Sequence, residues 1–191
     1  MKVLLASSEV HPFSKTGGLA DMVGALGKAL AAAGHEVGIV TPLYRGIRER
    51  FTELRGTDYR IEVPLGDATI AGGVAELALG PRLKVHFIDQ RDYFHRLALY
   101  GENNTDYPDN PQRFIFLSKA VVHLARWHPA GPFDIVHIHD WQVGLVPALL
   151  RWESHHTGWR APRSVLTIHN LAYQGRFAGS TFPLTNLPLD Y

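Results

Sequence analysis

Three short stretches of this sequence carry residue types that bind or transform polar ligands. The first is SKTGGLAD at residues 14–21, in which a lysine precedes two adjacent glycines. The second is HDWQ at residues 139–142, and the third is HNLAYQG at residues 169–175. Each follows an apolar run with the composition of a β-strand. The sequence therefore predicts polar groups just beyond the ends of three strands.

The lysine and glycines of the first stretch suit an anion. Gly17 and Gly18 at a helix start would let backbone N–H groups approach a phosphate, and Lys15 would add positive charge beside the helix dipole. The pattern is neither a P-loop nor a dinucleotide fingerprint, and the second strand ends at residues 40–42 without an acid for a ribose. The spacing leaves two interpretations open, a phosphate contact or a glycine turn beside a solvated lysine.

The second stretch offers a carboxylate beside an aromatic ring. Asp140 could accept hydrogen bonds from sugar hydroxyls while Trp141 covers an apolar sugar face, or Asp140 could cap the following helix. His137 and His139 share one face of the strand, but a metal site needs a third converging ligand. The sequence favours hydrogen-bonded core imidazoles there, and we expect neither a metal nor a cofactor.

The third stretch places a histidine and an amide at a strand end. His169 could be a general base, a substrate contact or a packed core residue, and Asn170 projects beside it. No serine or cysteine stands in a nucleophile-elbow context, so acyl-transfer hydrolysis has little support. Three tyrosines could also line a carbohydrate site, although aromatic residues near turns are common: Tyr93, Tyr100 and Tyr107.

The elements that must position these residues alternate between strand and helix patterns. Apolar runs at 2–7 and 35–42 flank a segment with helical spacing that ends at Gly34, which predicts a βαβ unit. Strands at 133–138 and 163–168 around another helix predict a second unit. We therefore expect an α/β fold, a mainly parallel sheet flanked by helices, which binds ligands beyond the carboxyl ends of its strands.

The pattern changes between the two units. Residues 58–65, 68–79 and 82–89 are expected to form three strands that are antiparallel or at an edge. Gly72-Gly73 inside the second of them predicts a bulge or a hairpin turn. Residues 97–110 are rich in Asn, Asp, Gly and Pro, which predicts a long loop.

Composition limits the class of protein. The chain has 191 residues, 46% hydrophobic and 19% charged, with a net charge of +1 and no cysteine. No basic stripe supports binding to nucleic acid or a membrane surface, and disulfides and thiolate metal sites are excluded. The apolar run after Lys2 is too short for a signal peptide or a membrane span. We expect a soluble cytoplasmic protein.

Taken together, the stretches resemble the N-terminal catalytic domain of bacterial glycogen synthases and plant starch synthases. The likeness runs from Met1 to about Gly175 and rests on SSEVHPFSKTGGLADMVGALGKAL, VTPLY, DNPQRF, DIVHIHDWQVGLVPALL and TIHNLAYQG. The resemblance implies one half of a two-domain GT-B glycosyltransferase, whose Rossmann-like domains face each other across a deep cleft. Residues 1–191 would then be an incomplete N-terminal domain, without the C-terminal domain that holds most of the nucleotide.

The resemblance also implies the reaction. Members of the family transfer glucose from ADP-glucose to the non-reducing 4-hydroxyl of an α-1,4-glucan such as glycogen, with retention of configuration. Lys15 and the amide of Gly18 would face the donor diphosphate. Asp140, His169 and Asn170 would line the glucosyl site, with the histidine holding the sugar and not acting as a nucleophile.

Three further residues follow from the resemblance. Asp21 and Glu9 would lie near the acceptor or support Lys15, and Tyr100 in LYGENN matches a loop tyrosine that approaches the sugar. Because the second domain supplies a basic pair and a glutamate in the family, we expect residues 1–191 alone to have negligible transferase activity. The alternatives are a two-domain transferase with another donor or acceptor, and a carbohydrate-binding module without catalysis. The missing glycine fingerprint disfavours a dinucleotide oxidoreductase.

Overall fold

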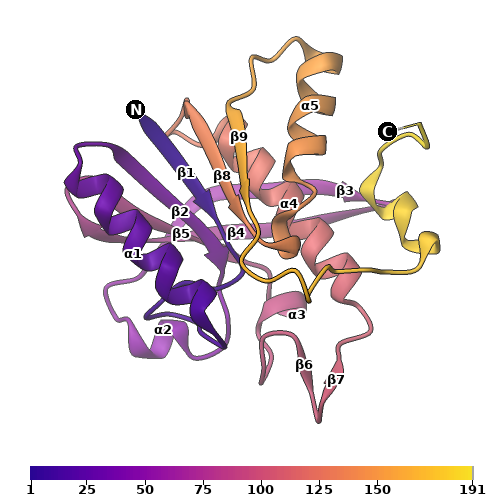
Figure 1. The fold of residues 1–191 in the computed structure, drawn as a ribbon, viewed down its shortest axis with the longest axis horizontal. Helices are drawn as coiled ribbons and strands as arrows, with labels where there is room; N and C mark the ends of the chain where they lie inside the picture. The colour runs from indigo at the N-terminus through magenta and orange to yellow at the C-terminus, as the bar shows by residue number, and fades with distance from the viewer. Residues whose placement is uncertain (191) are drawn as a thin grey trace.

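The computed structural model describes residues 1–190 and centres on a seven-stranded sheet in the order β3-β4-β5-β2-β1-β8-β9 (Figure 1). Its strands are β1 (Lys2–Ala6), β2 (Glu36–Pro42), β3 (Arg55–Leu65), β4 (Ala68–Gly80), β5 (Leu83–Asp89), β8 (Ile135–His139) and β9 (Arg163–Thr167). The longer helices are α1 (Gly18–Ala32), α4 (Asn110–Trp127) and α5 (Val146–Thr157). Shorter elements are α2 (Ile47–Arg50), α3 (Arg91–Phe94), η1 (Trp141–Val143), η2 (Gly179–Thr185) and the hairpin β6 (Gly101–Glu102) and β7 (Thr105–Asp106).

The parallel part of the sheet confirms both predicted βαβ units. The strand β1 pairs in parallel with β2 on one side and β8 on the other, and β8 pairs in parallel with β9. The helix α1 connects β1 to β2 and ends before Gly34, which adopts a left-handed φ of 91°. Leu4 and Leu5 are fully buried, as strands covered on both faces require.

Helices cover both faces of the sheet. A Cβ atom on Gly27 of α1 would lie 2.8 Å from Cδ1 of Ile39 in β2, so this helix packs very close to the strand. On the opposite face, Phe116 of α4 packs against β4, and α5 packs on α4. Among residues 1–190, no helix is both long and apolar enough to cross a membrane.

The strands β3 and β4 form the antiparallel edge that the sequence predicts, and β5 is antiparallel to β4 but lies inside the sheet and is parallel to β2. The bulge or hairpin turn predicted at Gly72-Gly73 is wrong. Gly72 pairs with Ile61 and Gly73 with Arg60 in regular register, and the β3 irregularity lies between Gly56 and Arg60. A Cβ atom on Gly72 would lie 3.1 Å from Cζ of Phe116 and 3.3 Å from a backbone oxygen. The glycine is therefore explained by the close approach of α4 and not by a bend in the strand.

The prediction of one long loop at 97–110 is also wrong, because this segment contains the β6–β7 hairpin. Asn103 and Asn104 join the two strands with φ of 52° and 58°. Positive φ at both central residues is the type I′ turn, whose twist matches that of paired strands, and asparagine tolerates it. The dipeptide Asn-Asn was the local signal for this hairpin.

Candidate active site

The sheet order brings the three polar stretches to one edge. Because β1, β8 and β9 are parallel neighbours, the segments that follow them all leave from the carboxyl ends of the strands (Figure 1). We call this edge, with residues 7–18, 139–142 and 168–175, the rim. The rim is where an open α/β sheet binds its ligands.

The SKTGG stretch leaves the N-terminus of α1 open. Gly17 is the N-cap residue, and no side chain caps the first turn. A Cβ atom on Gly17 or Gly18 would meet nothing within 4 Å, and neither residue has a left-handed φ. The fold itself therefore does not require glycine at either position. A ligand bound to the free N–H groups would require it, because a side chain there would occupy the space of the ligand. This geometry favours an anion contact over a simple glycine turn.

Lys15 is held beside this helix start by Asp21. The Lys15 Nζ lies 2.6 Å from Asp21 Oδ2, and both side chains are about half exposed, at 47% and 51%. The hydrogen bond from Lys15 is the main cause that lowers the pKa of the Asp21 carboxyl. Asp21 is expected either near the acceptor or as a support for Lys15, and its contact with Lys15 fits the second position.

Glu9 ties the SKTGG stretch to the segment around β6 and β7. Its buried carboxylate accepts hydrogen bonds from the Thr16 backbone N–H, from Thr16 Oγ1 at 2.6 Å and from Tyr100 Oη at 2.6 Å. Tyr100 Oη also lies 2.8 Å from Ser8 Oγ. No contact joins Glu9 to Lys15 among the described residues, so Glu9 positions the loop and not the lysine.

The Tyr100 hydroxyl is therefore directed into the protein. Burial is the main cause that raises its pKa well above the ordinary value for tyrosine, so the phenol keeps its proton. If Tyr100 approaches the sugar as the resemblance implies, it would do so with its ring or backbone, because its hydroxyl is hydrogen-bonded to Glu9 and Ser8. Its pairing with Glu9 spans 91 residues of sequence.

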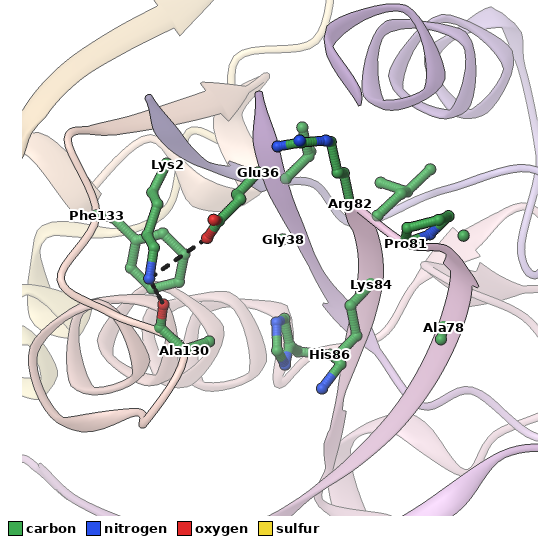
Figure 2. A pocket seen from close by; sticks show the side chains of 13 residues that line it. Lys2, Glu36, Gly38, Ala78, Pro81, Arg82, Lys84, His86, Ala130 and Phe133 are labelled. Atoms are coloured by element: carbon green, nitrogen blue, oxygen red, sulfur yellow. Dashed lines mark hydrogen bonds and ion pairs between the residues drawn. The ribbon is translucent and has the colours of Figure 1, made fainter. Parts of the chain in front are cut away.

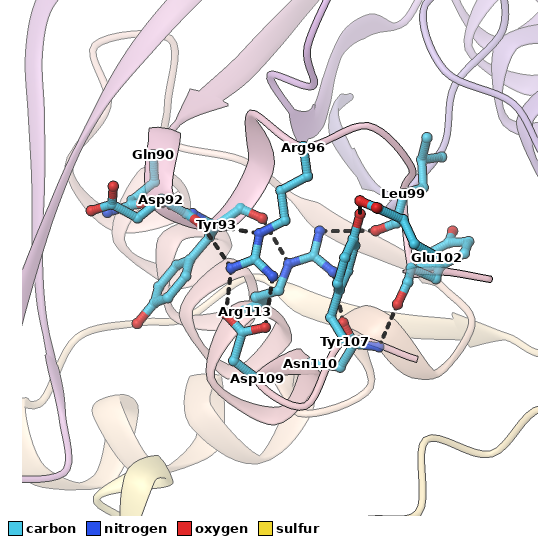
Figure 3. A network of polar contacts seen from close by, with 11 residues as sticks. Gln90, Asp92, Tyr93, Arg96, Leu99, Glu102, Tyr107, Asp109, Asn110 and Arg113 are labelled. Atoms are coloured by element: carbon cyan, nitrogen blue, oxygen red, sulfur yellow. Dashed lines mark hydrogen bonds and ion pairs between the residues drawn. The ribbon is translucent and has the colours of Figure 1, made fainter. Parts of the chain in front are cut away.

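Sequence reasoning missed the residue that organises this segment, Arg113 (Figure 3). Its guanidinium is fully buried and donates to the backbone oxygens of Tyr93 at 2.7 Å and Leu99 at 2.8 Å, and to Asn110 Oδ1 at 2.6 Å. Asn110 Nδ2 in turn donates to the Tyr100 backbone oxygen at 2.9 Å. The charged side chain satisfies loop carbonyls and thereby fixes the backbone that carries Tyr100.

A second arginine completes the network. Arg96 makes a two-pronged contact with Asp109, with distances of 2.7 and 2.5 Å, and its guanidinium lies 4.7 Å from the centroid of the Tyr107 ring (Figure 3). Of the three tyrosines predicted to line a sugar site, Tyr93 takes part in this network through its backbone oxygen and Tyr107 through its ring. The buried arginine, Arg113, stands between Gln112 and Phe114, and this local pattern does not distinguish it from an exposed arginine.

Asp140 is the most strained residue of the rim. Its backbone has φ 65° and ψ −178°, a region that residues other than glycine rarely adopt and that costs about 1–3 kcal/mol. Its Oδ1 accepts a hydrogen bond from the His169 backbone N–H at 2.7 Å, and its side chain does not cap η1. The capping alternative is therefore wrong, and the strained backbone holds a carboxylate between the ends of β8 and β9.

His169 is joined to the same strand ends by a second contact. Its Nε2 lies 3.1 Å from Nδ1 of His139, which is fully buried. Burial is the main cause that lowers the pKa of His139 to about 3, so this imidazole is neutral at physiological pH. His137 Nε2 lies 2.8 Å from Thr167 Oγ1. Both strand histidines are hydrogen-bonded imidazoles, as predicted, whereas His169 is only partly buried.

In the second and third stretches, Trp141 and Gly175 pack against each other, whereas Asn170 is exposed. Trp141 contacts Phe114 and Phe177 edge-on, with ring centroids 5.0 and 5.6 Å away. Gly175 has φ 59° and passes so close that a Cβ atom would lie 2.2 Å from the Trp141 ring. Asn170 is exposed, and its Oδ1 accepts from the Ala172 N–H at 2.9 Å. The Trp141 ring is thus part of the framework of the rim.

A cavity lies at the opposite, amino ends of the strands (Figure 2). It has a volume of about 330 Å³, and Lys2, Glu36, Lys84 and His86 are among the residues that line it. None of the predicted site residues is among its lining residues. We assign the site to the rim, because the chemistry-bearing side chains are there.

Beside this cavity, Glu76, His86 and His128 place three possible metal-ligand atoms within 4.8 Å of one another. The Ala130 N–H donates to His128 Nδ1 at 3.1 Å, which puts the His128 proton on Nε2, 3.1 Å from Glu76 Oε1. That hydrogen bond is the first cause that lowers the pKa of Glu76, and His86 and Lys84 add further ones. His128 and Lys84 thus donate to this carboxylate, whereas His86 Nδ1 lies 2.9 Å from Glu76 Oε1 without an aligned hydrogen bond.

Comparison with known proteins gives one consistent family. The family described as "Starch synthase catalytic domain" matches residues 2–191. A glycogen synthase of Syntrophotalea carbinolica is 43% identical over 191 residues, and one of Rhodopirellula baltica is 40% identical over 202 residues. Both alignments cover 100% of this chain, but only 39% and 40% of the relatives.

A solved structure leads to the same family. It is described as the catalytic domain of Starch Synthase IV from Arabidopsis thaliana bound to ADP and acarbose. It matches 99% of this chain with a TM-score of 0.82 and 31% identity, and the match covers 38% of that protein. The chain thus spans about two fifths of the length of its relatives. With a family match along nearly all of its length, the chain belongs to the starch synthase catalytic domain family.

Proposed function

We propose that this chain forms the N-terminal half of a retaining glucosyltransferase of the GT-B class. The whole enzyme would transfer glucose from ADP-glucose to the non-reducing 4-hydroxyl of an α-1,4-glucan such as glycogen. A second domain would supply most of the nucleotide contacts from across a cleft. The names of the relatives, and the ADP and acarbose in the solved starch synthase, support this donor and acceptor class.

Lys15 and the start of α1 would bind the donor diphosphate. The departing diphosphate gains negative charge in the transition state, so preorganised positive groups at that place lower the barrier. The open first turn of α1 supplies free N–H groups and the positive end of a helix dipole, and Lys15 supplies a full charge 2.6 Å from its support, Asp21. Gly17 and Gly18 leave room for the phosphate oxygens.

Asp140, His169 and Asn170 would line the glucosyl group. The strained backbone of Asp140 is the observation that carries this proposal, because such conformations persist only where the surrounding structure enforces them and they cluster at functional sites. A carboxylate at this place can accept hydrogen bonds from sugar hydroxyls and stabilise positive charge on the anomeric carbon. The hydrogen bonds of Glu9 to Thr16 and Tyr100 would fix the position of the SKTGG stretch relative to Asp140, His169 and Asn170.

The test is a chimera in which residues 1–191 replace the aligned segment of the Syntrophotalea carbinolica enzyme. We expect glucose transfer to glycogen from ADP-glucose, and a loss of about 10²-fold or more in Lys15→Ala. Lys28→Ala is the matched control, since Lys28 is an exposed lysine within α1, away from the start of this helix.

Three outcomes would contradict the proposal. A preference of the whole enzyme, with its own second domain, for UDP-glucose over ADP-glucose would indicate a related transferase with another donor. Glycogen binding without any turnover would indicate a carbohydrate-binding module. Equal activity of Lys15→Ala and Lys28→Ala would remove Lys15 from the diphosphate site.

A further inference from the structure

The contact between His139 and His169 is a hydrogen bond in the ring planes. The two nitrogens are 3.1 Å apart, the centroids are 5.4 Å apart, and the rings are tilted by only 26°. The centroid separation exceeds the nitrogen separation by about twice the distance from a ring centroid to its nitrogen, so both nitrogens lie close to the line between the centroids. The two rings therefore lie edge to edge, and one nitrogen must donate while the other accepts.

The surroundings of His139 decide which nitrogen donates. Its second nitrogen, Nε2, is buried and has no hydrogen-bond partner among the described residues. If the proton of the neutral ring were on Nε2, a buried N–H group would be left without an acceptor, which native structures rarely tolerate. With the proton on Nδ1, only a lone pair is left unpaired, and the N–H is used in the contact with His169.

We propose that His139 is a positioning residue that holds His169 as the tautomer protonated on Nδ1. His169 Nε2 accepts the hydrogen bond from His139, so the remaining proton of the neutral ring has to be on Nδ1. His169 is partly exposed at the rim, and its Nδ1 has no hydrogen bond to any of residues 1–190.

This arrangement distinguishes between a general base and a substrate contact, two of the roles that the sequence leaves open for His169. An Nδ1–H group donates a hydrogen bond to an oxygen atom of the substrate and cannot remove a proton from it. His169 is then a sugar-binding donor and not a general base, an assignment that rests on the proposed function for its ligand.

Nitrogen NMR on the 191-residue chain tests the tautomer directly. Long-range proton–nitrogen spectra distinguish a protonated, pyrrole-like ring nitrogen from an unprotonated, pyridine-like one. At neutral pH we expect His169 to show a pyrrole-like Nδ1 and a pyridine-like Nε2, with the same pattern in His139. His169→Gln assigns the signals. A pyrrole-like Nε2 in His169 would overturn the proposal.

Two substitutions separate positioning from packing. In His139→Asn, the amide replaces the Nδ1–H donor, and we expect His169 to keep its tautomer. In His139→Leu, the donor is lost, and we expect most of His169 to shift to the Nε2–H form. An unchanged His169 spectrum in His139→Leu would contradict the proposal. If the leucine variant fails to fold, the wild-type and asparagine spectra still decide the question.

The chimera adds a kinetic measurement. We expect His139→Leu to lower kcat about 10²-fold with little change in KM for glycogen, and His139→Asn to recover most of the rate. Equal losses in both variants would indicate a packing role. An inactive chimera would contradict the proposed function alone, because the tautomer is measured on the chain without turnover.

Discussion

The two ends of the sheet differ in whether their polar groups have partners within the protein. At the amino ends, nitrogen atoms of His86, His128 and Lys84 lie 2.9, 3.1 and 2.9 Å from the Glu76 carboxylate, so side chains of the protein surround its charge. At the rim, α1 has an uncapped first turn and Asp140 has a strained backbone. The difference indicates that the first cluster stabilises the fold, whereas the rim keeps binding capacity for a ligand.

Asp140 gives the largest expected effect. We expect Asp140→Gly and Asp140→Ala in the chimera to lower the transfer rate by about 10²- to 10³-fold. On the isolated chain, the glycine variant should be more stable than the alanine variant by about 1–3 kcal/mol, because glycine relieves the strained backbone. Urea unfolding measures this difference.

The sign of that difference is diagnostic. At an ordinary position, alanine is the more stabilising of the two residues, because glycine loses more backbone entropy on folding. Alanine at position 140 that is as stable as glycine would show that the backbone is not strained, and would weaken the contrast between the two ends of the sheet.

Glu76 gives the next largest effect, on stability. Glu76→Gln should lower the free energy of unfolding by about 2–3 kcal/mol, since it removes charged hydrogen bonds from a partly buried cluster. Chemical denaturation measures the loss, with exposed Glu53→Gln as the control. Transfer activity of the folded chimera should be unchanged, and a large loss of rate would place this end of the sheet in the mechanism.

His139 makes the stability of the rim depend on pH. Burial lowers its pKa from 6.5 to about 3, so the unfolded chain takes up this proton first as the pH falls. Its contribution is complete above pH 6.5 and is lost toward pH 3, at up to about 1.4 kcal/mol per pH unit.

Between pH 7 and pH 5, His139→Asn should therefore lose about 2 kcal/mol less stability than the wild type. Thermal unfolding across this range measures the difference, and exposed His155→Asn on α5 is the control. Parallel curves for the wild type and His139→Asn would mean that His139 is protonated in the folded chain.

Two glycines give the smallest effects. Gly72→Ala should destabilise the chain by about 1–2 kcal/mol, because the new methyl group would press on Phe116 of α4. Gly17→Ala should change stability by less than about 0.5 kcal/mol, because its methyl group has open space, yet it should weaken ADP-glucose use by the chimera. A large loss of stability in Gly17→Ala would support the glycine-turn interpretation.

Local patterns were sufficient for the framework of this protein. Apolar runs around a helical spacing predicted the parallel pairing of β1 with β2 and of β8 with β9, because period and length distinguish strands from helices. The same patterns fail at Gly72, where glycine makes room for a helix, and at residues 97–110, where they predict a loop and the structure has the β6–β7 hairpin. In both places the reason for a residue lies in its neighbours.

Sequence patterns alone were enough to predict the α/β framework, the family, and the position of Lys15, Asp140 and His169 beyond strand ends. How these residues are held became clear only from the folded structure. The contact of His139 with His169 spans 30 residues and that of Glu9 with Tyr100 spans 91. Local spacing does not encode such contacts, since they arise when parallel strands bring distant segments to the same edge of a sheet.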